Sequence, residues 1–108
     1  MKKFKALYKA MYDDLKDAEM MIKYAHDIRE ENPEDKNLAD ELAKYASFRL
    51  NHFMEFHTHF MTEAQKTPRI TEETVSMCMW EETHEMMQEW YEHIKAKVSK
   101  YTGEKSRG

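Results

Sequence analysis

Two short segments of the chain carry residues with the spacing of metal ligands. Glu81 and His84 are three residues apart, and so are Arg49 and His52. Residues three apart share one face of a helix, so Glu81 and His84 present a carboxylate and an imidazole together, as the carboxylate-bridged metal sites of four-helix bundles require. In the other pair a cation, Arg49, stands where the bridging carboxylate would be. Because a cation repels a metal ion, two interpretations stay open.

The first interpretation is a buried polar cluster without a metal. Its members lie where apolar helical stripes demand burial, and they are Glu19, Arg49, His52, Glu81 and His84. The planar guanidinium of Arg49 offers five donors and can bridge carboxylates from two helices. We therefore expect Arg49 to be buried and paired with Glu19, Glu81 or Glu82.

The second interpretation is a metal site, in which Glu19, His52, Glu81 and His84 hold iron, manganese or zinc and Arg49 is turned aside. Outside this site we expect no cofactor. The chain has no Gly-rich phosphate-binding loop and no Gly-x-Ser-x-Gly motif, so nucleotide binding and the corresponding hydrolase chemistry are not indicated. We predict no catalytic residues, and the motifs favour a chain that is not an enzyme.

A further group of residues is apolar but lies off the main helical stripes: Met20, Met21, Met79, Met86 and Trp90. The chain contains ten methionines, and a methionine side chain adapts its shape either to a core or to a partner. Met and Trp are also enriched in protein interfaces. We expect this group to form a surface for a protein partner, with core packing as the alternative for the clustered methionines.

The elements that must position these residues are helices. Only two Gly and two Pro occur in 108 residues, too few for a sheet protein with a turn every ~8 to 12 residues. Pro33 and Pro68 disfavour helical backbone before them. We predict an all-α chain with helices near residues 3–30, 34–65 and 71–101, in one domain over residues 1–102. Gly103 is expected to follow the last helix and to begin a flexible tail, residues 103–108.

Each predicted helix has one apolar stripe with residues three and four apart. The stripe residues are Phe4, Tyr8, Met11, Leu15, Ala18, Ile22 and Ala25 in the first helix, Leu38, Leu42, Tyr45, Ala46, Phe53, Phe56 and Phe60 in the second, and Ile70, Met77, Trp80, Met87, Tyr91, Ile94 and Val98 in the third. Three long helices bury such stripes incompletely unless another chain joins them. We therefore predict a homodimer.

Three motifs carry a resemblance to a known family. They are Asp17-Ala18-Glu19 with Tyr24-Ala25, residues 46–52 with His57, and Glu81-Glu82-Thr83-His84. With these motifs the chain resembles the ferritin-like and rubrerythrin-like bundles, including small versions found among bacteria and phages. The resemblance implies a ferritin-like bundle of three long antiparallel helices that dimerisation completes. In the family the second motif would be Glu-x-x-His, from which Arg49 departs.

Charge and cysteine content limit the setting and the partners. The 17 basic and 21 acidic residues give a net charge of −4, without the basic character of a nucleic-acid binder. The single cysteine excludes an internal disulfide and fits a cytoplasmic protein. No stretch approaches the ~20 consecutive apolar residues of a membrane span. We predict a protein that binds another protein, with a phage or mobile-element accessory protein that modulates a host factor as one form of this role. The alternative is a ferritin-like iron or manganese oxidoreductase or store.

Overall fold

The computed structural model describes the backbone of residues 2–66 and 72–107, and the side chains of residues 5–63 and 85–103. Its elements are α1 (Lys2–Glu31), the short 3-10 helix η1 (Pro33–Asp35), α2 (Lys36–Lys66) and α3 (Glu72–Arg107). No strand occurs among those residues, so the prediction of an all-α chain is confirmed.

The connection between α1 and α2 forms where the sequence places its first proline. The amide of Asn32 donates to the carbonyl oxygen of Ile28 at 2.8 Å, and the amide of Asp35 donates to the carbonyl oxygen of Asn32, also at 2.8 Å. Asn32 has non-helical backbone angles and Pro33 occupies the first turn of η1, where its missing N–H costs nothing because the first amides of a helix have no partner within it.

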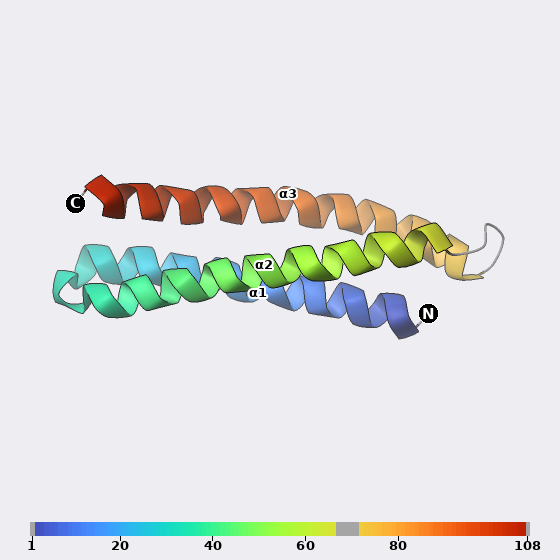
Figure 1. Cartoon of the computed structure of the whole chain (residues 1–108), viewed down its shortest axis with the longest axis horizontal. Coiled ribbons are helices and arrows are strands. Elements are labelled where there is room, and N and C mark those ends of the chain that lie inside the picture. Colours follow the sequence, from blue (N-terminus) through green and yellow to red (C-terminus); the bar gives the residue numbers. More distant parts are fainter. Residues whose placement is uncertain (1, 67–71, 108) are drawn as a thin grey trace.

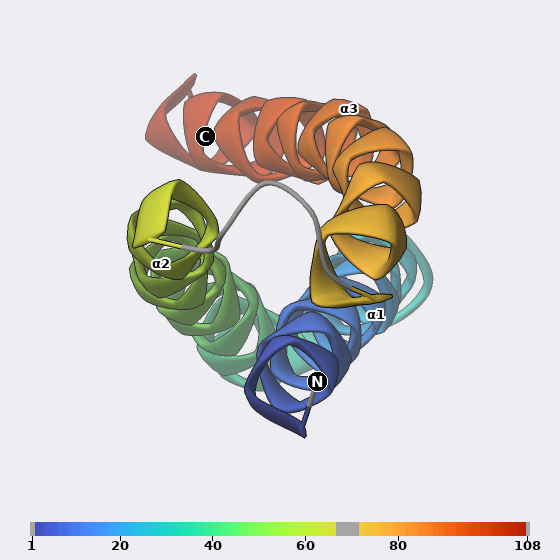
Figure 2. The same ribbon diagram turned by 90° about the vertical axis from the view of Figure 1, so that its right-hand side faces the viewer.

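The three helices make a long, narrow molecule. Successive helices run in opposite directions, and α3 covers one side of the pair formed by α1 and α2 (Figures 1 and 2). The molecule measures 57 × 20 × 17 Å, with a radius of gyration of 16.8 Å, against about 13 Å for a compact domain of this length. In the described residues, no helix is long and apolar enough to cross a membrane.

The predicted stripe of α1 is confirmed over most of its length. Five of its residues are fully buried in the core, namely Met11, Leu15, Ala18, Ile22 and Ala25. Tyr8 packs against this core while remaining half-buried, and the side chain of Phe4 lies outside the described residues.

The predicted stripe of α2 is confirmed at Ala46, Phe53 and Phe60, which are buried, but it is wrong at two other positions. Leu38 and Tyr45 were predicted to be buried, but they are 53% and 43% exposed. The buried residues of this half of the helix are Ala39, Ala43, Ala46 and Leu50. The alanines of α2 pack in the same core as Ala18 and Ala25 of α1. Small side chains let two helices approach closely, so the closest face of α2 is its alanine face and the larger residues lie beside it.

In α3 the buried residues recur every seven positions: Met87, Ile94 and Tyr101. Met87 and Ile94 were predicted, whereas Tyr101 was not. Trp90, Tyr91 and Val98 pack partly against the same core. The remaining predicted stripe residues of this helix, Ile70, Met77 and Trp80, lie outside the described residues or have side chains outside them.

The C-terminal end of α3 corrects the predicted boundary. The helix continues through Gly103 to Arg107, and no described glycine has a positive φ. The hydroxyl of Thr102 donates to the carbonyl oxygen of Val98 at 3.0 Å, within the helix. Glycine weakens a helix interior by about 1 kcal/mol but does not end it unless the backbone turns left-handed, which it does not do here.

Candidate functional site

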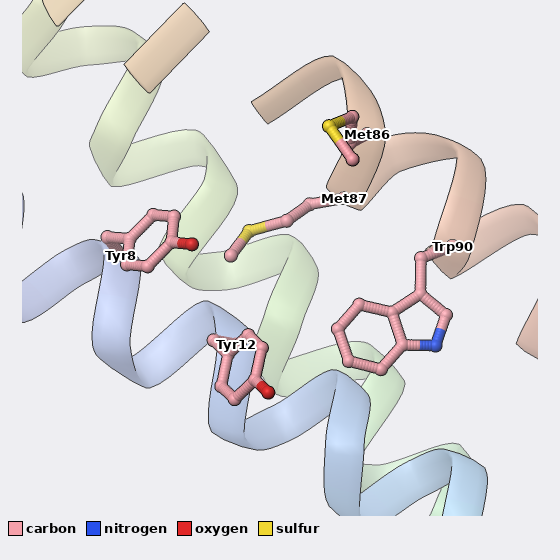
Figure 3. Close-up of a pocket in the computed structure, with 5 residues that line it drawn as sticks. All are labelled: Tyr8, Tyr12, Met86, Met87 and Trp90. Atoms are coloured by element: carbon pink, nitrogen blue, oxygen red, sulfur yellow. The ribbon is translucent and has the colours of Figure 1, made fainter. Parts of the chain in front are cut away.

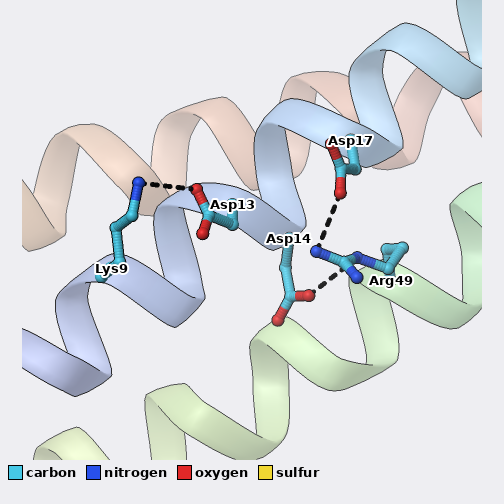
Figure 4. A network of polar contacts seen from close by, with 5 residues as sticks. All are labelled: Lys9, Asp13, Asp14, Asp17 and Arg49. Atoms are coloured by element: carbon cyan, nitrogen blue, oxygen red, sulfur yellow. Dashed lines mark ion pairs between the residues drawn. The ribbon is translucent and has the colours of Figure 1, made fainter.

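Arg49 lies at the centre of a polar network between α1 and α2 (Figure 4). Its Nε atom is 2.9 Å from Oδ1 of Asp14, and its Nη2 atom is 3.0 Å from Oδ2 of Asp17. The side chain of Arg49 is 22% exposed and that of Asp14 only 4%. Arg49 therefore bridges two carboxylates, as expected of a buried guanidinium, but both belong to α1 and neither is a predicted partner.

Asp14 pairs with Arg49 only imperfectly. Its Oδ2 atom is buried and has no hydrogen-bond partner among the described residues, and the N–H at Nε of Arg49 does not point at a carboxylate oxygen well enough to form a hydrogen bond. Burial raises the pKa of Asp14 above its ordinary value, and the nearby charge of Arg49 opposes this only in part. The two charged groups are close, but burial still disfavours the charged form of the Asp14 carboxyl.

Glu19 does not belong to this network. Its Oε2 atom accepts a hydrogen bond from the indole Nε1 of Trp90 on α3. The Trp90 ring in turn meets Tyr12 edge-on, with 5.6 Å between ring centroids. The predicted pairing of Glu19 with Arg49 is thus corrected, because Glu19 faces α3 whereas Arg49 meets the opposite flank of α1.

His52 is also separated from Glu19. Its ring lies 4.7 Å from that of Phe48 and 6.0 Å from that of Phe56, both on its own helix. Its proximity to Asp14 places it beside the Arg49 network. Glu81, Glu82 and His84 have side chains outside the described residues. In the part of the chain whose side chains are described, no three His, Cys, Asp or Glu residues gather as metal ligands.

An apolar cavity opens between α1 and α3. It has a volume of about 300 Å³ and is lined by Tyr8, Tyr12, Met86, Met87 and Trp90 (Figure 3). We call it the Met-Trp pocket. Met86 is 69% exposed at its edge, whereas Met87 is buried and points between the α1 tyrosines and Trp90 (Figure 3).

The structure thus brings together two of the five residues predicted to face a partner, Met86 and Trp90. Met20 and Met21 do not line the pocket. Met20 is half-exposed on α1, and Met21 packs partly against the core. Met79 has its side chain outside the described residues. Sequence reasoning did not identify Tyr8 and Tyr12 as part of this surface. The two residues are four positions apart on α1, a spacing that puts them on one face.

Sequence reasoning also missed a cluster around Tyr101 that joins all three helices. The Tyr101 hydroxyl donates to Oδ1 of Asp40 on α2 at 2.7 Å. Arg29 of α1 lies over its ring at 3.8 Å and donates to its backbone oxygen at 3.0 Å. The His26 ring meets the Tyr101 ring edge-on at 5.2 Å. Burial and the bond to Asp40 raise the pKa of Tyr101 to about 12.

A smaller polar contact joins α2 to α3. The side-chain amide nitrogen of Gln88 lies 3.1 Å from Nε2 of His57, and burial lowers the pKa of His57. The His57 ring also stacks on Phe53 at 6.0 Å. This contact holds the middle of α3 on the α2 side, opposite the Met-Trp pocket.

A scan of protein-family models and searches of curated proteins and of solved structures found no significant match to this chain.

Proposed function

We propose that this protein acts by binding another protein, and that the Met-Trp pocket receives an apolar side chain from a helix of that partner. The observation that supports this proposal is Met86, a large apolar side chain that is 69% exposed beside an apolar cavity. An exposed apolar side chain next to a cavity favours burial against a partner.

The chemistry of the lining supports a protein partner. Tyr, Trp and Met are the residue types enriched at the buried centres of protein interfaces. Trp90 is held by Glu19 and Tyr12, so one wall of the pocket is organised before a partner arrives, which lowers the cost of binding. Met86 at the edge can change rotamer to fit the incoming side chain.

The charges beside the pocket favour a particular orientation of the partner helix. Lys5 is exposed on α1, three residues before the pocket residue Tyr8. Glu85 and Glu89 are exposed on α3, on either side of the pocket methionines. The proposed partner helix therefore presents an apolar face flanked by acidic residues toward α1 and by basic residues toward α3, which favours one docking direction.

The metal-binding alternative has less support. Of its four predicted ligands, the two with described side chains, Glu19 and His52, contact different neighbours and do not share a site. A homodimer, and a role as a phage or mobile-element accessory protein, remain predictions. The Met-Trp pocket supports only the broader proposal that this chain binds a protein partner.

A library of displayed peptides with helical sequences tests the proposal. Peptides selected on the parent protein should carry apolar residues at i and i+3 or i+4, and their binding should weaken about tenfold or more for Tyr12→Ser and Met86→Ser, a typical loss for an interface anchor. Trp90 fluorescence, measured in a Trp80→Phe background, should shift on binding because the indole lies in the pocket wall.

Met61→Ser is the matched control, because Met61 is also an exposed methionine but lies on α2. Peptides that bind Tyr12→Ser and Met86→Ser as tightly as they bind the parent, or that leave Trp90 fluorescence unchanged, would contradict the proposal. Failure to select any helical peptide would contradict it too.

A further inference from the structure

A second apolar surface lies on the outer side of the α1 and α2 pair. Five large apolar residues there are between 39% and 56% exposed: Met20 and Tyr24 on α1, and Leu38, Tyr45 and Phe48 on α2. We call this surface the outer face. None of these residues lines the Met-Trp pocket.

The three α2 residues share one side of their helix. Tyr45 follows Leu38 by seven residues and precedes Phe48 by three, the intervals that return to one face. Asp40, which meets Tyr101 of α3, is two residues from Leu38 and so lies about 200° around the helix. Phe48 is five residues from Phe53, which stacks on Tyr91 of α3, and so lies about 140° around the helix from it. The outer face of α2 therefore points away from α3.

Tyr24 lies next to these residues across the helix pair. Asp17 of α1 pairs with Arg49 of α2, and the two helices run in opposite directions (Figure 1). Tyr24, seven residues after Asp17, therefore lies near Leu42, seven residues before Arg49. Leu42 lies between Leu38 and Tyr45 along α2. Tyr24 is also two residues from His26, which faces α3, so it points to the other side of α1.

We propose that the outer face binds a second copy of this chain. α3 covers one side of the helix pair (Figure 2), and the outer face lies on the side that α3 leaves uncovered. A second copy brings the same face, which lets two outer faces cover each other about a two-fold axis.

The size of the outer face suits a copy of itself, and Arg49 beside it is already paired. At roughly 100 Å² for each half-exposed side chain, the five residues supply roughly 500 Å² of apolar area, most of the ~800 Å² that each partner buries in a standard interface. The guanidinium of Arg49 lies 6.0 Å from the Tyr45 ring and is already paired with Asp14 and Asp17. Arg49 itself therefore adds no unpaired cation to this face.

Sedimentation velocity over a range of micromolar concentrations tests the proposal. The parent should sediment at twice its chain mass of 13.1 kDa. Phe48→Lys and, separately, Leu38→Lys should shift the protein toward monomer, with the dissociation constant raised about thirtyfold or more, because each places an unpaired cation in the interface. Both residues are more than half exposed in the single chain, so the helical circular dichroism should not change.

Met61→Lys is the matched control on the same helix. Met61 is 40% exposed but lies about 140° to 160° around the helix from the outer-face residues, so this variant should remain dimeric. A parent that is monomeric throughout would overturn the proposal. So would a dimer that persists in both outer-face variants. The inference does not depend on the Met-Trp pocket: Met86→Ser should leave the dimer intact, and a dimer lost in that variant alone would move the interface to the pocket.

Discussion

Asp14 and Arg49 show how a predicted polar cluster can form with different members. The sequence contains carboxylates on α1 at positions 13, 14, 17 and 19, and helical spacing alone could not decide which of them faces Arg49. Asp14 and Asp17 face it because they lie on the α2 side of α1, whereas Glu19 lies on the α3 side. Glu19 lies about 160° around α1 from Asp17, so a shift along the helix pair would not exchange these partners.

The pH dependence at this site follows from the burial of Asp14. Burial raises the pKa of this carboxyl, so the folded chain binds this proton more tightly than the unfolded chain does. The contribution of Asp14 to stability is therefore largest below the ordinary value of 3.8 and decreases as the pH rises through the folded-state value. Arg49 limits this loss at neutral pH.

Removing Arg49 should consequently destabilise the fold. We expect Arg49→Met to lower the free energy of unfolding by about 3 to 5 kcal/mol at neutral pH, because it leaves the Asp14 carboxylate buried without a cation. The double variant Asp14→Asn with Arg49→Met should recover much of that loss, since no buried charge remains. Asp17→Asn should cost less than about 1 kcal/mol, because Asp17 is 42% exposed. Urea unfolding of the four proteins decides the matter, and an Arg49→Met variant as stable as the parent would contradict it.

At the scale of elements, hydrophobicity alone does not predict which residues of α2 are buried, because helix packing also decides. The predicted stripe included Leu38 and Tyr45, which are large and apolar but exposed. Beside the predicted Ala46, the structure buries Ala39 and Ala43, since small residues allow α1 and α2 to approach. Helix boundaries were predictable to within one or two residues at the prolines, where the backbone chemistry is local.

Other elements of the site were less predictable for physical reasons. Trp90 and Met86 were identified from their residue types, but the two tyrosines that complete the pocket lie on another helix, and only tertiary packing brings them there. The end of α3 was misjudged because Gly103 suggests a helix terminus only when the backbone adopts a left-handed conformation, which a sequence does not report.

A matched pair of substitutions on α2 tests the revised core. We expect Leu50→Ala to cost about 2 to 5 kcal/mol, since Leu50 is 5% exposed and its truncation leaves a cavity. Leu38→Ala should cost less than about 1 kcal/mol, because Leu38 is 53% exposed. Both should be measured by urea unfolding in the Phe48→Lys background, so that dimer formation does not contribute. Equal losses of unfolding free energy at the two positions would mean that Leu38 is packed in the core, and would contradict the core described above.

At the scale of the whole molecule, Tyr101 connects all three helices at one end of a long bundle. It reaches Asp40 of α2 through its hydroxyl and Arg29 of α1 through its ring and backbone oxygen. A molecule 57 Å long and 20 Å wide has a thin core, so a fully buried aromatic residue at one end contributes much of the local packing. The cluster therefore fixes the C-terminal half of α3 against the α1 and α2 pair.

Titration of Tyr101 should weaken this connection at high pH. The neutral phenol is the form that the fold favours, because its pKa is raised from 10 to about 12. Its contribution to stability is therefore complete below pH 10 and is lost as the pH rises through 12. Between pH 8 and pH 11 the parent should lose about 1 kcal/mol more than Tyr101→Phe, which has no phenol to titrate at this position.

At pH 8 the parent should be the more stable of the two proteins. Tyr101→Phe should be about 1 to 3 kcal/mol less stable than the parent, because it lacks the hydrogen bond to a carboxylate. Urea unfolding at pH 8 and pH 11 measures both differences, with Tyr12→Phe as a control for a tyrosine that is partly exposed. The two proteins differ only in the Tyr101 hydroxyl. Only the titration of this group can therefore narrow the difference in unfolding free energy between parent and variant. A gap that stays constant from pH 8 to pH 11 would show that the Tyr101 hydroxyl does not hold α3 in place.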